Sequence, residues 1–369
     1  MKIAVYAICL NEAKFVDRFM DACAGADYVV IADTGSTDGT AEAFRQRGAL
    51  VHDIRINPWR FDAARNAALA LVPGDADICF ALDIDEVLCH DWRTKLEKGW
   101  RQGATRGQYL LVYSHLPDGS PGVQFHNARI HLRHGYSWRH ICHEAIYPDG
   151  IEESFVLIPD LRVDHYPDRS RSRGFYLPML ERAVKAEPHE PRMAHYLARE
   201  YYYNARYEEA IAEFRRYLDM NGHFTGERVG SMIFIGKCLT ALGRDPMPWY
   251  LRAVAEMPDS REGWVALAET YYRLQDWPNC YSAAMKSLSI GRSHDGYSKD
   301  PHAYGAAPHD LAALGAWYIG LHTEAIEHAR RALDFAPDDR RLQDNLALMQ
   351  KQAASPPSLP AVYDMAVSA

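Results

Sequence analysis

Residues 28–40 read YVVIADTGSTDGT, an apolar and β-branched run that ends at Asp33 and continues into a turn rich in Gly, Ser and Thr. The run is typical of a strand in a parallel sheet covered on both faces. The turn predicts a strand-to-helix connection whose backbone N–H groups and hydroxyls can face a ligand. It is neither a Walker loop nor a dinucleotide-binding loop, because Gly-Lys-Ser/Thr and Gly-x-Gly-x-x-Gly are both absent.

Apolar runs and helical patterns alternate on both sides of this stretch. Further strands are predicted over residues 3–10, 50–54 and 78–82, and helices over residues 12–24, 40–47 and 60–71. Residues 108–165 are less regular and rich in β-forming residues. The alternation predicts an open α/β sheet, which places ligands beyond the carboxyl ends of its strands.

A second polar segment, Leu82-Asp83-Ile84-Asp85-Glu86, follows the strand predicted to end at residue 82. Strand geometry puts Asp83 and Asp85 on the same side, with Glu86 beside them as a supporting residue. Paired carboxylates at the end of a strand suit a hard divalent cation. Solvated loop acids often produce the same pattern, but acids that directly follow a buried strand need a partner.

From about residue 172 the sequence becomes helical, rich in Tyr and Ala, and internally repetitive. Ala210 and Cys280 occupy equivalent positions 70 residues apart, which is two periods of about 35. The next equivalent residue, Ala325, follows after 45 because a Gly/His/Asp-rich stretch is inserted at 291–305. This spacing predicts tetratricopeptide repeats rather than unrelated amphipathic helices. The predicted organisation is an α/β domain over 1–172, a helical repeat domain over 173–352 and a loose, Pro-containing tail over 353–369.

Composition and charge exclude several classes of protein. The chain has 369 residues, of which 48% are hydrophobic and 24% charged, as in ordinary globular proteins. A net charge of −8 argues against a surface that binds nucleic acid all over, although residues 93–185 carry a local charge of +4. Seven scattered cysteines without a CxxC pair predict neither disulfides nor a zinc ribbon, and favour the cytoplasm. No apolar stretch approaches the length of a membrane span.

Four short motifs occur in order along the first quarter of the chain. They are CLNE at 9–12, DTGSTDGT at 33–40, FDAARN at 61–66 and DIDE at 83–86. Together they resemble the inverting family 2 glycosyltransferases with the GT-A fold, in the branch that carries C-terminal tetratricopeptide repeats. The resemblance implies a GT-A domain that transfers a sugar from a nucleotide-sugar, with a UDP-sugar preferred. It also implies that Mn²⁺ or Mg²⁺ binds at the Asp-x-Asp motif.

The resemblance further implies roles for individual residues. Asp33 would contact the nucleobase, Arg65 would face the nucleotide-sugar, and Asp83 would lie by the ribose or the sugar. The complete set implied to bind the donor is Asn11, Glu12, Asp33, Arg65, Asp83 and Arg129. The metal ligands would be Asp85, Asp83 and His165, the last of these in a His-Tyr element at 165–166.

Inversion at the anomeric carbon also requires a base that takes a proton from the acceptor. The segment WRHICHE at 138–144 is similar to the His-Glu element of the same branch and nominates Glu144. His143 would orient Glu144 or contact phosphate. A late acid could equally be structural, and a single histidine among the 17 in the chain is more often a surface or core residue.

The acceptor and two rival functions stay open at this level. Helical repeats favour a peptide, a protein or another polymer such as a glycan, by analogy only. The basic middle segment leaves modified nucleobases of DNA as an alternative acceptor. A nucleotidyltransferase would release pyrophosphate instead, but no Gly-rich nucleotidyl-transfer loop is found near the N-terminus. A non-catalytic repeat scaffold is the third possibility, and the intact acidic and arginine motifs argue against it.

Overall fold

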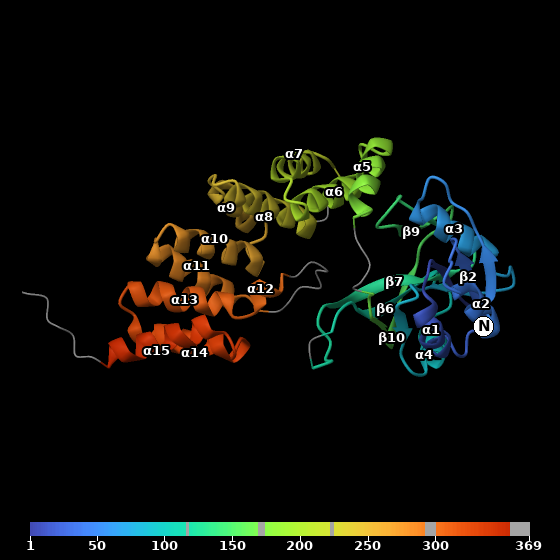
Figure 1. The fold of residues 1–369 in the computed structure, drawn as a ribbon, viewed down its shortest axis with the longest axis horizontal. Coiled ribbons are helices and arrows are strands. Elements are labelled where there is room, and N and C mark those ends of the chain that lie inside the picture. Colours follow the sequence, from blue (N-terminus) through green and yellow to red (C-terminus); the bar gives the residue numbers. More distant parts are fainter. Residues whose placement is uncertain (116–117, 169–173, 222–224, 292–299, 355–369) are drawn as a thin grey trace, which may run out of the picture. The chain divides into compact units, whose positions relative to one another are not determined.

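The computed structural model describes residues 1–115, 118–168, 174–221, 225–291 and 300–354, and the chain divides into two compact units (Figure 1). The first unit is Met1–Glu200 and the second is Tyr201–Ala369. The division lies later than the predicted boundary at 172/173, which follows the change in composition. Most of the predicted tail and residues 292–299 of the predicted insertion lie outside the described residues.

Helices α5 (Tyr176–Ala186) and α6 (Pro191–Tyr203) explain this later division. The ring of His143 stacks on Tyr196 in α6 and on Tyr176 in α5, with centroid distances of 3.8 and 5.6 Å. These stacking contacts attach α5 and the first part of α6 to the α/β unit, although the local sequence is already helical there.

The core of the first unit is an eight-stranded mixed sheet with the order β3-β2-β1-β4-β7-β6-β10-β5. Four parallel strands lie side by side in its first half, namely β1 (Ile3–Cys9), β2 (Tyr28–Asp33), β3 (Leu50–Asp53) and β4 (Ile78–Ala81). The sheet continues through β7 (Gln124–Leu132), β6 (Arg106–Val112), β10 (Phe155–His165) and β5 (Glu86–Leu88). A separate hairpin joins β8 (Tyr136–Arg139) to β9 (Ala145–Pro148).

Both faces of this sheet are covered, which explains why its central strands are apolar on both sides. Ile3, Val5 and Ala7 of β1 pack with one core, while Ala4 and Tyr6 pack with the other. The first core is covered by η1 (Ala13–Phe15), α1 (Val16–Ala22), α2 (Thr40–Gln46) and α4 (Trp92–Gly99). The second is covered by α3 (Phe61–Leu71) and the β8–β9 hairpin (Figure 1). The predicted α/β sheet is confirmed.

The second unit consists of helices that pack against their neighbours in sequence. In chain order they are α7 (Tyr207–Leu218), α8 (Thr225–Ala241), α9 (Met247–Glu256), α10 (Arg261–Arg273), α11 (Trp277–Ser289), α12 (Pro301–Tyr304), α13 (Ala307–Tyr318), α14 (His322–Phe335) and α15 (Arg340–Ala353). Small residues lie where helices approach closely: a Cβ added to Gly315 of α13 would lie 2.8 Å from the backbone nitrogen of Tyr281 in α11. Ala268 and Cys280 are likewise fully buried. This arrangement confirms the predicted tetratricopeptide-like helical region.

Candidate functional site

Asp33, at the carboxyl end of β2, organises the turn that follows it. Its Oδ1 accepts hydrogen bonds from the backbone N–H groups of Gly35 and Ser36, both at 2.8 Å, and its Oδ2 accepts one from the Cys9 thiol at 3.3 Å. Burial works against ionisation of Asp33, but the hydrogen bonds from Ser36 and Gly35 outweigh it and lower the pKa of the carboxyl. The ionised side chain of Asp33 therefore holds the backbone of the turn in place. A contact between Asp33 and a nucleobase stays a prediction.

The loop after β1 is tied to this turn. The Oδ1 of Asn11 accepts a hydrogen bond from the backbone N–H of Thr37 at 2.8 Å, and the Asn11 N–H donates to the Ser36 hydroxyl at 2.9 Å. The Glu12 N–H donates to the Thr40 hydroxyl at 2.7 Å. The structure thus places Asn11 and Glu12 beside the turn of Asp33, in one polar wall at the carboxyl edge of the sheet.

Arg65 is the buried centre of an ion-pair network. It lies on α3 with 4% of its surface exposed, and its Nη2 donates to Oδ1 of Asp83 at 2.5 Å. Its Nε donates to the Glu144 carboxylate, and Arg129 donates through Nη1 to Oδ2 of Asp83 at 2.8 Å. Four residues predicted separately from the sequence therefore form one contiguous group.

Charge within this network holds Asp83 as a carboxylate. Burial alone would raise the pKa of Asp83, but the charges of Arg65 and Arg129 outweigh it and hold the pKa well below its usual range. Because both Asp83 oxygens accept hydrogen bonds from arginine, the geometry gives this residue the role of organising the two guanidinium groups. The predicted role of Asp83 as a metal ligand has less support here than that of Asp85.

One nitrogen of Arg65 is left for a ligand. Its Nη1 is buried and has no hydrogen-bond partner among the described residues. The guanidinium also lies over the ring of Trp138, 4.9 Å from the centroid. A buried donor without a partner is costly, so a phosphate or sugar oxygen bound at this nitrogen would stabilise the site.

Two supporting residues in this region were not predicted. Asn66 exchanges two hydrogen bonds of 2.8 Å with the backbone of Trp138, which joins α3 to β8 beneath Arg65. Asn66 lies in the FDAARN motif and Trp138 in the WRHICHE segment. The sequence therefore marks both positions but does not show that the two residues contact each other. Their role is to hold the guanidinium of Arg65 in place.

Glu86 supports the turn after β4 from inside. It is 3% exposed, and its Oε2 accepts a hydrogen bond of 3.0 Å from the Asp83 N–H. Its Oε1 lies 3.6 Å from Nη1 of Arg129. Burial, followed by the negative charge of Asp83, raises the pKa of Glu86 to about 7. Glu86 thus fixes the backbone and the arginine that surround Asp83.

Asp85 and His165 form a second part of the site. Asp85 Oδ2 lies 3.3 Å from Nε2 of His165, and Nδ1 of His165 lies 3.1 Å from the carbonyl oxygen of Tyr113. Burial lowers the pKa of His165, but the hydrogen bond and the charge of Asp85 outweigh it, and the net shift is upward. A carbonyl that takes the Nδ1 proton and directs Nε2 toward a carboxylate is the usual arrangement around a metal-binding histidine. The carboxylate and imidazole donors therefore fit a divalent cation.

His143 is held by contacts with α6. Its ring lies nearly parallel to that of Tyr196, with an interplanar angle of 10°, and its carbonyl oxygen accepts a hydrogen bond of 3.2 Å from Nε of Arg192. These contacts attach the loop that carries Glu144 to α6. Orientation of Glu144 or a contact with phosphate by His143 stays a prediction.

Comparison with known proteins identifies this part of the chain. Residues 5–143 match the family model described as Glycosyl transferase family 2. This segment is therefore similar to family 2 glycosyltransferases. The lipopolysaccharide core biosynthesis glycosyltransferase LpsC of Rhizobium meliloti (strain 1021) is 30% identical over 164 residues, and the match covers 41% of this chain. The match spans 58% of the length of that relative.

Solved structures are more distantly similar. MamA is 14% identical with a TM-score of 0.37, and the match covers 44% of this chain and 82% of that protein. Yeast Tom70 is 17% identical with a TM-score of 0.37, and the match covers 50% of this chain and 37% of that protein. The glycosyltransferase domain is thus supported by the family match, and the repeat fold by the helix packing described above.

Within the described residues, no helix combines the length and the apolar character that crossing a bilayer requires.

Proposed function

We propose that this chain is a metal-dependent, inverting glycosyltransferase that transfers a sugar from a nucleoside diphosphate sugar, with UDP as the first candidate. The observation that carries the proposal is the network of Arg65, Asp83, Arg129 and Glu144 within a family 2 glycosyltransferase domain. Asp83, with Asp85 two residues later, places this network at the carboxyl end of β4, where open α/β sheets bind ligands.

The donor would bind along the carboxyl edge of the sheet. The joined loops at Asn11 and Asp33 would hold the nucleoside, with backbone N–H groups and hydroxyls as polar contacts. Arg65 and Arg129 would face the diphosphate and the sugar. The unpartnered Nη1 of Arg65 is the specific donor group that a bound oxygen would satisfy.

Asp85 and His165 would hold Mn²⁺ or Mg²⁺. When bound, the cation offsets the negative charge that develops on the leaving diphosphate. The hydrogen bond from His165 to the carbonyl oxygen of Tyr113 would keep Nε2 directed toward the ligand position. Asp83 would contribute by holding both arginines.

Glu144 would act as the base. Its carboxylate would accept the proton of an acceptor hydroxyl while that oxygen forms its bond to the anomeric carbon and the bond from sugar to phosphate breaks. Arg65 contacts both Glu144 and Asp83, so one guanidinium connects the base to the donor side of the site. Positioning of this kind supplies a large part of the catalysis when the groups are held rigidly.

Two acceptor classes are proposed, each from a different observation. The helical repeats favour a peptide or protein, because such arrays present extended concave surfaces. The name of the relative LpsC places that protein in lipopolysaccharide core synthesis, which favours a glycan. Transfer of radiolabelled sugar to core oligosaccharide, and separately to peptide libraries, distinguishes the two.

The cysteines support the predicted cytoplasmic location. All seven are free, and six of them are buried. Burial raises the pKa of Cys79 and of Cys142 to about 12, so these thiols stay protonated and serve as packing groups. Free thiols of this kind are typical of a reducing compartment.

A donor screen tests the proposed function. Thermal melting of the full chain with Mn²⁺ is measured with UDP-, GDP- and dTDP-sugars, and the released nucleotide is identified. The expected result is stabilisation by one donor class, release of the nucleoside diphosphate, and loss of both in Asp85→Asn. The matched control Asp17→Asn, at an exposed carboxylate of α1, keeps both. Release of pyrophosphate would establish a nucleotidyltransferase instead, and stabilisation by no donor would support a scaffold.

A further inference from the structure

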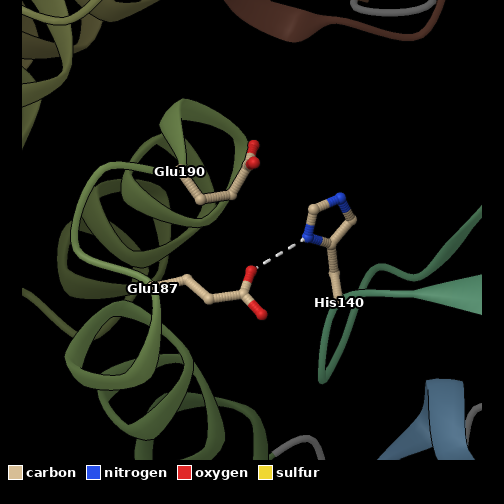
Figure 2. A group of neighbouring side chains, drawn as sticks. All are labelled: His140, Glu187 and Glu190. Atoms are coloured by element: carbon tan, nitrogen blue, oxygen red, sulfur yellow. Dashed lines mark ion pairs between the residues drawn. The ribbon is translucent and has the colours of Figure 1, made fainter.

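A second cluster of ligand-type side chains lies in the first unit, outside the proposed donor site. It consists of His140, directly after β8, and of Glu187 and Glu190, between α5 and α6 (Figure 2). Among the residues that the structure describes, this is the one group of three His, Cys, Asp or Glu side chains whose ligand atoms all lie within 4.8 Å. No role for these residues follows from the sequence motifs or from the proposed transfer reaction.

His140 is the observation that points to a ligand. Its side chain is 6% exposed, and its Nδ1 is buried without a hydrogen-bond partner among the described residues. The Nε2 atom lies 3.0 Å from the Tyr147 hydroxyl. With the proton on Nε2 and donated to Tyr147, the lone pair of Nδ1 faces the two carboxylates. That arrangement is unfavourable unless a cation lies between them.

The distances suit a small cation. Oε2 of Glu187 lies 3.5 Å from Nδ1 of His140, as the dashed line in Figure 2 marks. Ligand atoms around a tetrahedral zinc ion lie about 3.4 Å apart, because Zn–N and Zn–O bonds are about 2.0–2.2 Å long. Figure 2 shows the Glu190 carboxylate on the same side of the imidazole ring as Glu187. The Oε1 of Glu190 also accepts a hydrogen bond of 3.1 Å from the Arg192 N–H, which orients it.

The surroundings leave room and negative charge for a cation. The cluster lines a surface cavity of about 340 Å³, together with Arg60, Asp62, Trp138, Arg139 and Tyr147. Two arginines against three carboxylates leave one negative charge on this lining. Both arginines contact other residues of the same lining: Arg60 donates to Asp62 at 2.7 and 3.0 Å, and Arg139 lies over the ring of Tyr147.

We propose that His140, Glu187 and Glu190 bind a divalent cation of the zinc class, with water completing the coordination. One imidazole and two carboxylates are ligands that zinc accepts. The bound ion would attach the loop after β8 to the connection between α5 and α6. Since Glu144 lies four residues after His140 on that loop, the ion would restrict the position of the proposed base.

Zinc binding by the full chain tests this site without reference to activity. The chain is stripped with a chelator, and Zn²⁺ alone is titrated in competition with a chromophoric chelator. His140→Gln and Glu190→Gln are each expected to weaken one site by more than ~100-fold, the upper range for loss of a supporting residue around a metal. His189→Gln is the matched control, because this exposed histidine lies between the two glutamates but outside the cluster.

Asp85→Asn separates this site from the proposed donor-side metal. It is expected to keep the His140-dependent site and the rise in melting temperature that Zn²⁺ produces. Equal zinc binding by the wild type and His140→Gln would overturn the proposal, and so would loss of the same site in Asp85→Asn. Circular dichroism in metal-free buffer verifies folding, and Glu190→Gln supplies the same test if His140→Gln does not fold.

Discussion

The two units of this chain bury polar groups in different ways. The first unit buries charged side chains, including Asp33, Asp62, Arg65 and Glu86, whereas the buried polar residues described in the second unit are Ser231, Thr270, Ser287 and His328. The three hydroxyls donate to carbonyl oxygens of their own helices, three or four residues earlier. Buried charge is costly unless paired, so the difference indicates that the first unit maintains a functional site, while the second is organised by packing.

The largest expected effect follows from removal of the central cation. Arg65→Met leaves the carboxylates of Asp83 and Glu144 without their buried partner, so we expect a loss of about 3–5 kcal/mol in the free energy of unfolding and loss of transfer. Urea denaturation measures the first and a transfer assay the second. The control Arg331→Met removes an exposed i,i+4 pair with Glu327 in the second unit and should cost no more than about 0.5 kcal/mol. Similar costs for both variants would contradict the comparison.

A packing change in the second unit should destabilise without touching donor binding. Gly315→Ala places a Cβ 2.8 Å from the backbone of Tyr281, which cannot turn aside, and we expect a cost of about 1–3 kcal/mol. A Cβ added to Gly230 of α8 would have no atom within 4 Å outside the local helix backbone. Gly230→Ala should therefore raise the free energy of unfolding by about 0.5–1 kcal/mol, because alanine favours helix over glycine. Thermal melting measures both, and donor binding should match the wild type. Stabilisation by Gly315→Ala would show that the helices are less closely packed than described.

We also expect acid to destabilise the first unit, because His131 is buried there as a neutral ring. Burial lowers the pKa of His131 to about 3, below its ordinary value of 6.5, so folding favours the neutral ring. The stability is then fully present above pH 6.5 and is lost as the pH falls toward 3. His131→Gln should therefore reduce the loss of unfolding free energy between pH 6.5 and 4.5 by about 1–3 kcal/mol.

Urea denaturation at each pH measures this difference. The exposed His134→Gln is the control and should keep the pH dependence of the wild type. An unchanged slope in His131→Gln would mean that the ring does not stay neutral in the folded chain. The Nε2 atom of His131 also forms a hydrogen bond of 2.9 Å with the Tyr6 hydroxyl, which the substitution removes at every pH. The variant is therefore compared by the pH dependence of its unfolding free energy rather than by its absolute stability.

The smallest effect is expected from a buried hydroxyl of the second unit. Ser287 donates to the carbonyl oxygen of Ala284 at 2.7 Å, and that carbonyl belongs to the same helix. Ser287→Ala should change the free energy of unfolding by less than about 1 kcal/mol, because alanine also favours helix. Asp83→Asn, which removes a partly buried charge paired with Arg65 and Arg129 in the first unit, should cost more in the same denaturation experiment. A larger cost for Ser287→Ala than for Asp83→Asn would contradict the proposed difference between the two units.

Local patterns determined much of the fold. The alternation of residues 3–82 predicted β1 to β4 and the helices between them, because burial on both faces makes each strand apolar and each turn polar. The repeat period predicted the helical unit for a similar reason, since small residues must recur wherever helices approach. The Asp-x-Asp motif directed attention to the end of β4 because its acids follow a buried strand.

Tertiary structure alone decided which side chains meet. Arg65 and Glu144 lie 79 residues apart and pair only because the loop after β8 returns to α3. His140 meets Glu187 because α5 and α6 pack on the first unit, although the sequence is already helical there. A sequence motif reports the chemistry that a residue can perform, since that depends on residue type and near neighbours. The choice between a metal ligand and an arginine partner for Asp83 depends on the path of the backbone, which brings Arg65 and Arg129 to its two oxygens.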